Sequence, residues 1–400
     1  MKNYKQTIYA CFTGYIVQAV VVNFAPLLFL TFQSEYQIPL SQITTLISIN
    51  FLLQLLIDSA AAFFVDKIGY RISIVAAHIF SGLGLIFLAT LPSLLNNAFA
   101  GLLIAVITYA IGGGLLEVLI SPIVEACPTD NKEKAMSMLH SFYSWGTVGV
   151  IGLSTLFFFL FGIQNWKILT LIWAILPIIN SIIFTKVPIA SLIATDEKGF
   201  SLLQLFREKM FWLFMLIILC SGASEQVIGQ WASTFVETSL HLPKIIGDLI
   251  GPMLFAICMG TTRTIYGKFG DKINLGKMML FSSISCCISY LFVALTASPI
   301  LSIVGFCLSG LSIGILWPGT FSIASASIPK GGTTMFALFA LFGDLGCSVG
   351  PAVVGFASNN QTSQLKFGIL IAIVFPLLLI VGTSIFLIQK HKKHACQSNN

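Results

Sequence analysis

Long apolar runs, separated by short polar connections, determine what this chain of 400 residues can fold into. Such runs number about twelve, and they cover roughly 7–32, 41–64, 72–92, 98–124, 137–162, 166–186, 210–236, 247–267, 275–297, 300–327, 333–357 and 366–388. A bilayer core accommodates about 20 apolar residues as one spanning α-helix. The pattern therefore predicts an all-α membrane protein with twelve transmembrane helices.

The composition excludes most soluble classes. Charged residues make up 9% of the chain, whereas soluble domains carry about 25%. Nucleic acid is not an expected partner, because the net charge of +6 is small and the basic residues are scattered. The nine Cys residues form no Cys-x-x-Cys pair, and neither a phosphate-binding loop nor a metalloprotease motif occurs. We therefore expect neither an enzyme nor a bound metal or cofactor.

The basic residues predict the orientation of the chain in the membrane. If both termini are cytoplasmic, 17 Lys and Arg residues lie at inner loops or ends and three at outer loops, with Arg263 inside a span. This bias follows the positive-inside rule. The N-terminus lacks a small-residue cleavage site, so the first run is interpreted as a span and not as a signal peptide. We expect a multi-pass protein of the inner or plasma membrane of a bacterium.

A polar connection, KVPIASLIATDEKGFSLLQLFREKM (Lys186–Met210), divides the spans into six and six. A short surface helix is expected within it, around Leu202–Glu208. The resulting division is an N-terminal six-helix bundle at 1–187, a cytoplasmic linker at 188–209, a C-terminal six-helix bundle at 210–390 and a basic cytoplasmic tail at 391–400.

The two halves repeat each other. AAFFVDKIGYR (Ala61–Arg71) follows the second span and YGKFGDKINLGK (Tyr266–Lys277) follows the eighth, and each places an Asp, a Lys and further basic residues at a cytoplasmic turn. Parallel repeats about an axis along the membrane normal are typical of transporters that rock around a central site. The halves are therefore expected to be pseudo-symmetric bundles.

The first of these repeats resembles the cytoplasmic signature of the major facilitator superfamily, Gly-x-x-x-Asp-Arg/Lys-x-Gly-Arg-Arg/Lys. Ala62 replaces the first Gly, and the other positions are filled by Asp66, Lys67, Gly69 and Arg71. A looser second copy contains Gly267, Asp271, Lys272, Gly276 and Lys277. The resemblance covers the whole chain and implies the major facilitator fold.

Within that superfamily the chain resembles the fucose permease-like branch of sugar–proton symporters. The fourth span, GGGLLEVLISP, keeps the branch's Gly112, Gly114, Leu116, Glu117 and Pro122, with Ser121 in place of Asn. The tenth span (GLSIGILWPGTFSIA), the seventh (GASEQVIGQW) and the eighth, through Gly260 and Arg263, are also similar. The first span departs from the branch, because Phe24 follows Asn23 where an acidic residue is typical.

Two acidic residues within spans are the candidates for proton coupling, Glu117 and Glu225. A carboxylate at bilayer depth costs roughly 2.5–3.5 kcal/mol on insertion scales, so it is expected to face water or substrate. The alternative for each is a structural acid that is hydrogen-bonded to a neighbouring helix.

The candidate substrate-binding residues offer amide, hydroxyl, charged and aromatic groups that suit a hydroxyl-rich ligand. They are Gln18, Asn23, Ser121, Tyr143, Gln226, Gln230, Trp231, Arg263, Trp317 and Asp344. For Arg263 the sequence leaves open a pair with Glu225 or Asp344, or a place near an inner gate with Asp271. Trp317 is either a wall for sugar stacking or an ordinary packed aromatic.

Charged residues at the cytoplasmic ends are the candidates for gating, namely Asp58, Asp66, Lys67, Arg71, Asp271 and Lys272. They can pair across the two halves when the inside is shut, and they can also cap helix termini. Asp58 lies about two helical turns deeper than Asp66, so it either faces the cavity or joins the gate.

Taken together, these features lead us to expect a monomeric secondary active transporter that moves a small polar solute, a sugar, by proton-coupled alternating access. Its partners are then the solute, protons and the lipid bilayer. The alternatives are proton-coupled efflux of amphipathic compounds, favoured by the 34 Phe residues and the missing first-span acid, and a membrane sensor that binds solute without moving it.

Overall fold

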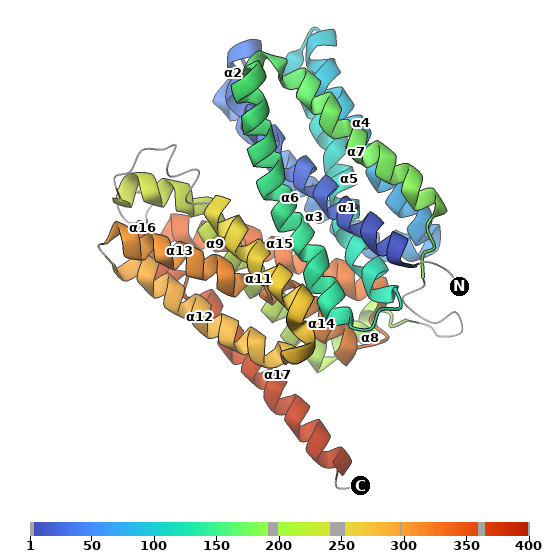
Figure 1. Cartoon of the computed structure of the whole chain (residues 1–400), viewed down its shortest axis with the longest axis vertical. Helices are drawn as coiled ribbons and strands as arrows, with labels where there is room; N and C mark the ends of the chain where they lie inside the picture. Colours follow the sequence, from blue (N-terminus) through green and yellow to red (C-terminus); the bar gives the residue numbers. More distant parts are fainter. Residues whose placement is uncertain (1–3, 191–198, 241–252, 297, 359–364, 399–400) are drawn as a thin grey trace. The chain divides into compact units, whose positions relative to one another are not determined.

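The computed structural model describes residues 4–190, 199–240, 253–296, 298–358 and 365–398 (Figure 1). Throughout these ranges the regular elements are helices, and no strand occurs in them. The prediction of an all-α chain is therefore confirmed.

The first half of the chain contains α1 (Tyr4–Asn23), η1 (Ala25–Leu28), α2 (Phe29–Tyr36), α3 (Leu40–Ile68), α4 (Tyr70–Leu94), α5 (Ala98–Ala126), α6 (Lys132–Phe161), η2 (Ile163–Asn165) and α7 (Trp166–Lys186). The second half contains α8 (Leu202–Arg207), α9 (Lys209–Leu240), α11 (Leu254–Phe269), η4 (Gly270–Lys272), α12 (Leu275–Leu295), α13 (Pro299–Ile313), α14 (Leu316–Ser327), α15 (Gly332–Ala357), α16 (Leu365–Ile371) and α17 (Val374–Ser398).

Ten helical stretches among the described residues are long and apolar enough to cross a membrane. The predicted second span corresponds to α3, within which Leu52–Ala61 is an apolar stretch. The predicted eighth span corresponds to α11, which begins soon after 241–252, a segment outside the described residues. Several membrane passes are therefore confirmed, while the number twelve and the cytoplasmic position of both termini stay predictions.

The chain divides into two compact units. Unit 1 comprises Met1–Thr129, Phe142–Lys198 and Gly332–Leu338, and unit 2 comprises Asp130–Ser141, Gly199–Gly331 and Phe339–Asn400. Each unit thus contains mainly one half of the sequence, but α6 begins in unit 2 and α15 begins in unit 1. The predicted bundle and linker boundaries stay predictions.

The linker contains α8, which confirms the short helix predicted around Leu202–Glu208. A capping box starts this helix: the Ser201 hydroxyl accepts from the Gln204 backbone N–H, and the Gln204 side chain accepts from the Ser201 N–H at 2.8 Å. Both bonds satisfy backbone donors that the first helical turn leaves without a partner.

Three consecutive glycines of α5 allow close helix packing in unit 1. A Cβ at Gly112 would lie 2.6 Å from the Ser81 backbone nitrogen of α4 and 2.7 Å from the Ala77 carbonyl oxygen. A Cβ at Gly113 would meet Val21 of α1, and one at Gly114 would meet Ile57 of α3. Because successive helical residues point in different directions, α5 approaches three neighbouring helices at one level, as small residues permit in membranes.

The predicted tenth span of unit 2 is broken into α13 and α14 at Gly314 and Ile315. Pro318 has no N–H, so it cannot donate to the Gly314 carbonyl four residues earlier. Arg263 of α11 supplies the missing donor, because its Nε bonds to the Gly314 oxygen at 2.9 Å. The Thr262 hydroxyl also donates to the Leu311 oxygen at 2.7 Å. These hydrogen bonds connect α11 to the tenth span at the break.

Replacing Gly112 by Ala is expected to lower the unfolding temperature, because the new methyl group meets backbone atoms of α4. Overpacking of this kind costs on the order of 1–3 kcal/mol. Gly149→Ala on α6 is the matched control, since a Cβ there has nothing within 4 Å. That change is expected to be neutral or stabilising by up to about 1 kcal/mol. Thermal unfolding in detergent measures both, and equal effects would contradict the packing argument.

Arg263→Met is expected to destabilise unit 2 by about 3–5 kcal/mol, because it removes one partner of a buried ion pair as well as the donor to the Gly314 oxygen. In a Pro318→Ala background the same change is expected to cost less, because the alanine introduced there has a backbone N–H that can bond to the Gly314 oxygen. Chemical unfolding of the two single variants and the double variant measures this coupling. Additive effects would show that the Gly314 carbonyl does not depend on Arg263.

Candidate functional site

A cluster of polar side chains joins α1 to α5 in unit 1. The Gln18 amide donates to Glu117 Oε2 at 2.9 Å, and the Tyr15 hydroxyl bonds to the Ser121 hydroxyl at 2.8 Å. The Tyr143 ring of α6 lies edge-on to Tyr15, with the ring centroids 6.3 Å apart. The structure thus brings together four of the predicted residues, with Tyr15 as a member that the sequence did not single out.

Helical spacing explains why these residues meet. Tyr15 and Gln18 are three residues apart on α1, and Glu117 and Ser121 are four apart on α5, so each pair lies on one face of its helix. Gln18 is only 5% exposed, and its Oε1 has no hydrogen-bond partner among the described residues. An amide oxygen buried in this way is costly unless it finds a donor. The cluster can therefore accept one further hydrogen bond.

Asn23 lies apart from this cluster. Its amide donates to the Ala19 oxygen at 2.9 Å and to the Thr147 hydroxyl of α6 at 3.3 Å. Asn23 therefore connects α1 to α6, and these two hydrogen bonds do not involve Glu117. Thr147 was not predicted, although a Thr in an apolar run is a recognisable signal.

In unit 2, Arg263 and Glu225 form a buried ion pair. Arg263 Nη2 lies 3.4 Å from Glu225 Oε2, and the two side chains are 3% and 15% exposed. Arg263 Nη1 also donates to the His140 carbonyl at 3.4 Å. Of the partners that the sequence left open for Arg263, the structure shows Glu225. Because breaking a buried pair leaves a charge uncompensated, these two residues depend on each other.

The other predicted residues of unit 2 are more dispersed. The Trp231 indole donates to the Pro351 oxygen at 3.1 Å, while Gln230 is exposed and Gln226 is half-buried. Asp344 is half-buried on α15, and its carbonyl accepts from Ser348.

Trp317 is a packed aromatic in unit 2. It is 9% exposed, and its ring stacks on Phe321 with the centroids 6.3 Å apart. The ring also occupies the place that a Cβ at Gly343 of α15 would take. Of the two interpretations of Trp317, the packing inside unit 2 favours the packed aromatic.

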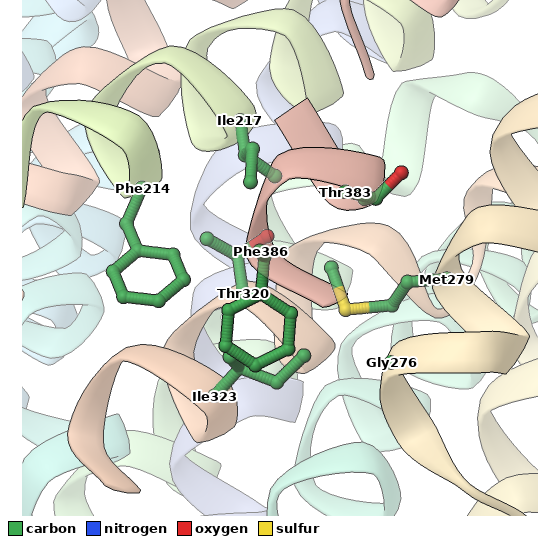
Figure 2. A pocket seen from close by; sticks show the side chains of 8 residues that line it. All are labelled: Phe214, Ile217, Gly276, Met279, Thr320, Ile323, Thr383 and Phe386. Atoms are coloured by element: carbon green, nitrogen blue, oxygen red, sulfur yellow. The ribbon is translucent and has the colours of Figure 1, made fainter. Parts of the chain in front are cut away.

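A small apolar cavity lies between α9, α12, α14 and α17 (Figure 2). Its volume is about 10 Å³, roughly the space of a single water, and none of the predicted substrate-binding residues lines it. Its lining is Phe214, Ile217, Gly276, Met279, Thr320, Ile323, Thr383 and Phe386. A void of this size and polarity is a packing defect within unit 2 and not a solute site.

The predicted gating residues have different surroundings. Arg71 donates to the carbonyls of Phe184, Thr185 and Val187 at 2.8–2.9 Å, so it caps the C-terminus of α7. Lys67 and Lys272 are exposed, Asp58 is fully buried, and the side chain of Asp66 lies outside the described residues.

Asp271 is the centre of a network at the start of α6. Lys134 pairs with one of its carboxylate oxygens, and the Asn131 amide donates to the other at 2.9 Å. The hydrogen bond from Lys134 lowers the pKa of Asp271 from its usual value. Close by, the Tyr266 hydroxyl donates to Glu133 at 2.8 Å. Lys134, Asn131 and Glu133 were not predicted, although they stand in the polar connection before the fifth span.

A buried pair on α4 and α7 was also missed. His78 is fully buried; its Nδ1 lies 2.8 Å from the Ile74 oxygen and its Nε2 2.8 Å from the Asn180 amide nitrogen. Asn180 donates further to the Ala10 oxygen of α1 at 3.0 Å. A His and an Asn inside apolar runs were the signal, and together they fix the N-terminal part of α1, the helix that carries Gln18.

Solved structures with the same fold support the architecture. FucP, a major facilitator transporter in the outward conformation, matches with a TM-score of 0.81 at 15% identity, over 95% of this chain and 98% of that one. The proton:xylose symporter XylE matches with a TM-score of 0.80 at 12% identity, over 96% and 94%. At such identities the likeness shows the fold alone.

Curated relatives match over parts of their length. The multi-drug resistance efflux pump PmrA of Streptococcus pneumoniae is 30% identical over 204 residues, 48% of this chain and 49% of the pump. The glucose/mannose transporter GlcP of Bacillus subtilis is 27% identical over 140 residues, 34% of each chain. The chain thus spans half or less of the length of these relatives. The family model of the Major Facilitator Superfamily matches residues 10–351, and the chain belongs to that superfamily.

Proposed function

We propose that this protein is a secondary active transporter that moves a small polar solute, a sugar, by proton-coupled alternating access. The observation that carries the proposal is the partly buried hydrogen bond between Gln18 and Glu117, beside a Gln18 oxygen without a partner among the described residues. We propose that it acts as a monomer in the plasma membrane of a bacterium.

The Gln18 amide suits both protonation states of Glu117. An ionised carboxylate can accept from the amide nitrogen, an arrangement that is compatible with the 2.9 Å bond. A side-chain amide has both a donor and an acceptor. If the Gln18 amide rotates by about 180°, a protonated Glu117 can instead donate to the amide oxygen. The Gln18 oxygen that has no partner in the described structure is thus available for this second bond.

Hydroxyl-rich solutes fit the remainder of the cluster. Tyr15, Ser121 and Tyr143 provide hydroxyl groups that both donate and accept, and aromatic rings provide apolar faces. The relative GlcP is a glucose/mannose transporter, and the proton:xylose symporter XylE shares the fold. A ligand drives the switch only if its affinity differs between the two conformations, so protonation and solute are proposed to favour different states.

Efflux of amphipathic compounds is the second candidate. PmrA, the relative with the higher identity, is a multi-drug efflux pump, and Phe24 occupies the position where the sugar branch typically has an acid. The sign of proton movement separates the two candidates. Adding a symported sugar to proteoliposomes draws protons in with it, whereas an exported drug moves against them. A sensor would give no exchange of labelled solute in counterflow.

We further propose that the Asp271 network is part of a cytoplasmic gate. Lys134 lies in the first turn of α6, which corresponds to the predicted fifth span, and Asp271 follows α11, which corresponds to the predicted eighth span, 137 residues later. In this proposal the bond, which lies within unit 2, forms in one conformation and breaks in another. Arg71, by contrast, is assigned to capping α7, and Asp66, Lys67 and Lys272 keep their proposed gating role without a described ion pair.

Glu117→Gln is expected to abolish proton-driven uptake while leaving exchange of solute, because the amide keeps a hydrogen bond to Gln18 but cannot release a proton. Uptake of labelled glucose, mannose, fucose and xylose into proteoliposomes with and without a proton gradient measures this. Glu208→Gln, an exposed acid before α9, is the matched control and should retain both activities. Gradient-driven uptake by Glu117→Gln at the level of the unchanged protein would refute the coupling role.

The effect of Asp271→Asn is expected to depend on pH. The folded carboxyl has a lowered pKa, so its pair with Lys134 contributes fully above the unfolded value of about 3.9 and is lost as the pH falls through the folded value. The variant should therefore differ from the unchanged protein in exchange rate at pH 7 and approach it under acid conditions. Lys134→Asp with Asp271→Lys should restore exchange that either single reversal impairs. A double reversal as impaired as the single ones would argue against the pair.

A further inference from the structure

The short helix α8 turns large apolar side chains outward, although it lies outside the stretches that are long enough to cross a membrane. Leu203 is 62% exposed and Phe206 is 43% exposed. They are three residues apart, so they share one face of the helix. Exposed apolar groups that gather outside a span indicate a contact surface. The face formed by Leu203 and Phe206 is therefore suited to contact with an apolar partner.

Contacts within unit 2 fix the orientation of this face. Leu205, on another side of α8, is fully buried. The Trp212 indole of α9 donates to the Phe206 carbonyl oxygen at 2.9 Å. The Phe206 ring centroid also lies 5.5 Å from that of Trp212 and 6.0 Å from that of Phe211. Because α8 is packed on the start of α9, its apolar face is a fixed feature of the folded chain.

The same contacts place α8 at the edge of a membrane-crossing stretch. Trp212 is exposed and stands in the first turn of α9, near the start of the apolar stretch Lys209–Ala232. Trp is enriched at the boundary between lipid and water. Because the Trp212 indole bonds to the last turn of α8, that helix lies at the level of this boundary.

Basic side chains border the apolar face. Arg207 is exposed and follows Leu203 by four residues, so the two lie side by side on the helix surface. Lys209 is also exposed, directly after the end of the turn that follows α8. An apolar face flanked by cations is typical of helices that lie in the membrane surface and are attracted to anionic lipids.

We propose that α8 docks on the membrane surface at the predicted cytoplasmic side, with Leu203, Phe206 and Trp212 among the lipids and Arg207 on the phosphates of anionic phospholipids. The apolar face of such a helix reaches about 5–10 Å into the boundary between headgroups and acyl chains. The docked helix attaches the end of the polar connection between the two sequence halves to the bilayer. The proposal is independent of what the protein transports, because it rests on the contacts of α8 within unit 2.

Hydrogen exchange of the full-length protein in lipid nanodiscs tests the docking. Backbone amides of residues 201–212 should exchange more slowly in discs of phosphatidylcholine mixed with phosphatidylglycerol than in discs of phosphatidylcholine alone. Arg207→Gln should reduce this difference about five-fold, the effect of one cation beside an anionic surface, whereas Arg207→Lys should keep it. Equal exchange of the unchanged protein in both kinds of disc would overturn the proposal. Protection that varies with protein concentration and not with lipid would overturn it too, because it indicates a second copy of the chain on this face.

Fluorescence quenching by lipids with brominated acyl chains measures the depth of the apolar face. The emission added by Phe206→Trp should be quenched strongly. Glu208→Trp is the matched control, because position 208 lies two residues further on and about 200° around the helix axis, and its added emission should be quenched less. Equal quenching of the two variants would contradict the docked orientation.

Leu203→Ser should speed up the exchange of the amides at 201–212 in the mixed discs, because it removes an apolar anchor. Leu295→Ser on α12 is the control, since Leu295 is 65% exposed but does not belong to this face. That variant should leave the exchange at 201–212 unchanged. The same effect from both variants would show that Leu203 is not an anchor.

Discussion

A backbone carbonyl in an apolar layer needs a hydrogen-bond donor, and a proline four residues later in the helix cannot provide one. Unit 2 contains such a carbonyl, and the helices around it depend on the side chain that bonds to it. Pro318 has no N–H to donate to the Gly314 oxygen, and the Nε of Arg263 donates to that oxygen instead. The same guanidinium reaches Glu225 with Nη2 and the His140 oxygen with Nη1. One guanidinium group thereby donates to the carbonyl at the helix break, to the Glu225 carboxylate and to the His140 carbonyl. The arrangement connects α11, α9, α13 and the start of α6 within a single unit.

In unit 1, the contacts around α5 place Glu117 against α1. The three glycines before it set the distance of α5 from α4, α1 and α3, because each has a neighbouring helix where its Cβ would be. At the other end of α1, Asn180 holds the Ala10 carbonyl. Between these contacts Gln18 reaches Glu117. The position of the acid therefore depends on packing contacts and a carbonyl hydrogen bond that carry no charge.

Sequence patterns predicted the helices and the residues that share a face, since apolar runs and spacings of three or four are local properties. Gln18 and Glu117 were both singled out, but their contact depends on which helices meet, and periodicity does not encode that. The role of Arg71 as a cap of α7 was foreseen only as one of two options, because its partners are carbonyls 113 or more residues away. Tyr15 and the His78–Asn180 pair were missed because a single polar residue in an apolar run has no distinctive spacing.

The Trp317 ring fills the place where a side chain at Gly343 would stand. This shape relation constrains the order in which the two positions can change during evolution. A larger residue at 343 clashes while the indole is present, whereas a smaller residue at 317 opens a gap that a larger 343 can then occupy. Homologous sequences should therefore show the two sites varying together, with bulk exchanged from one helix to the other.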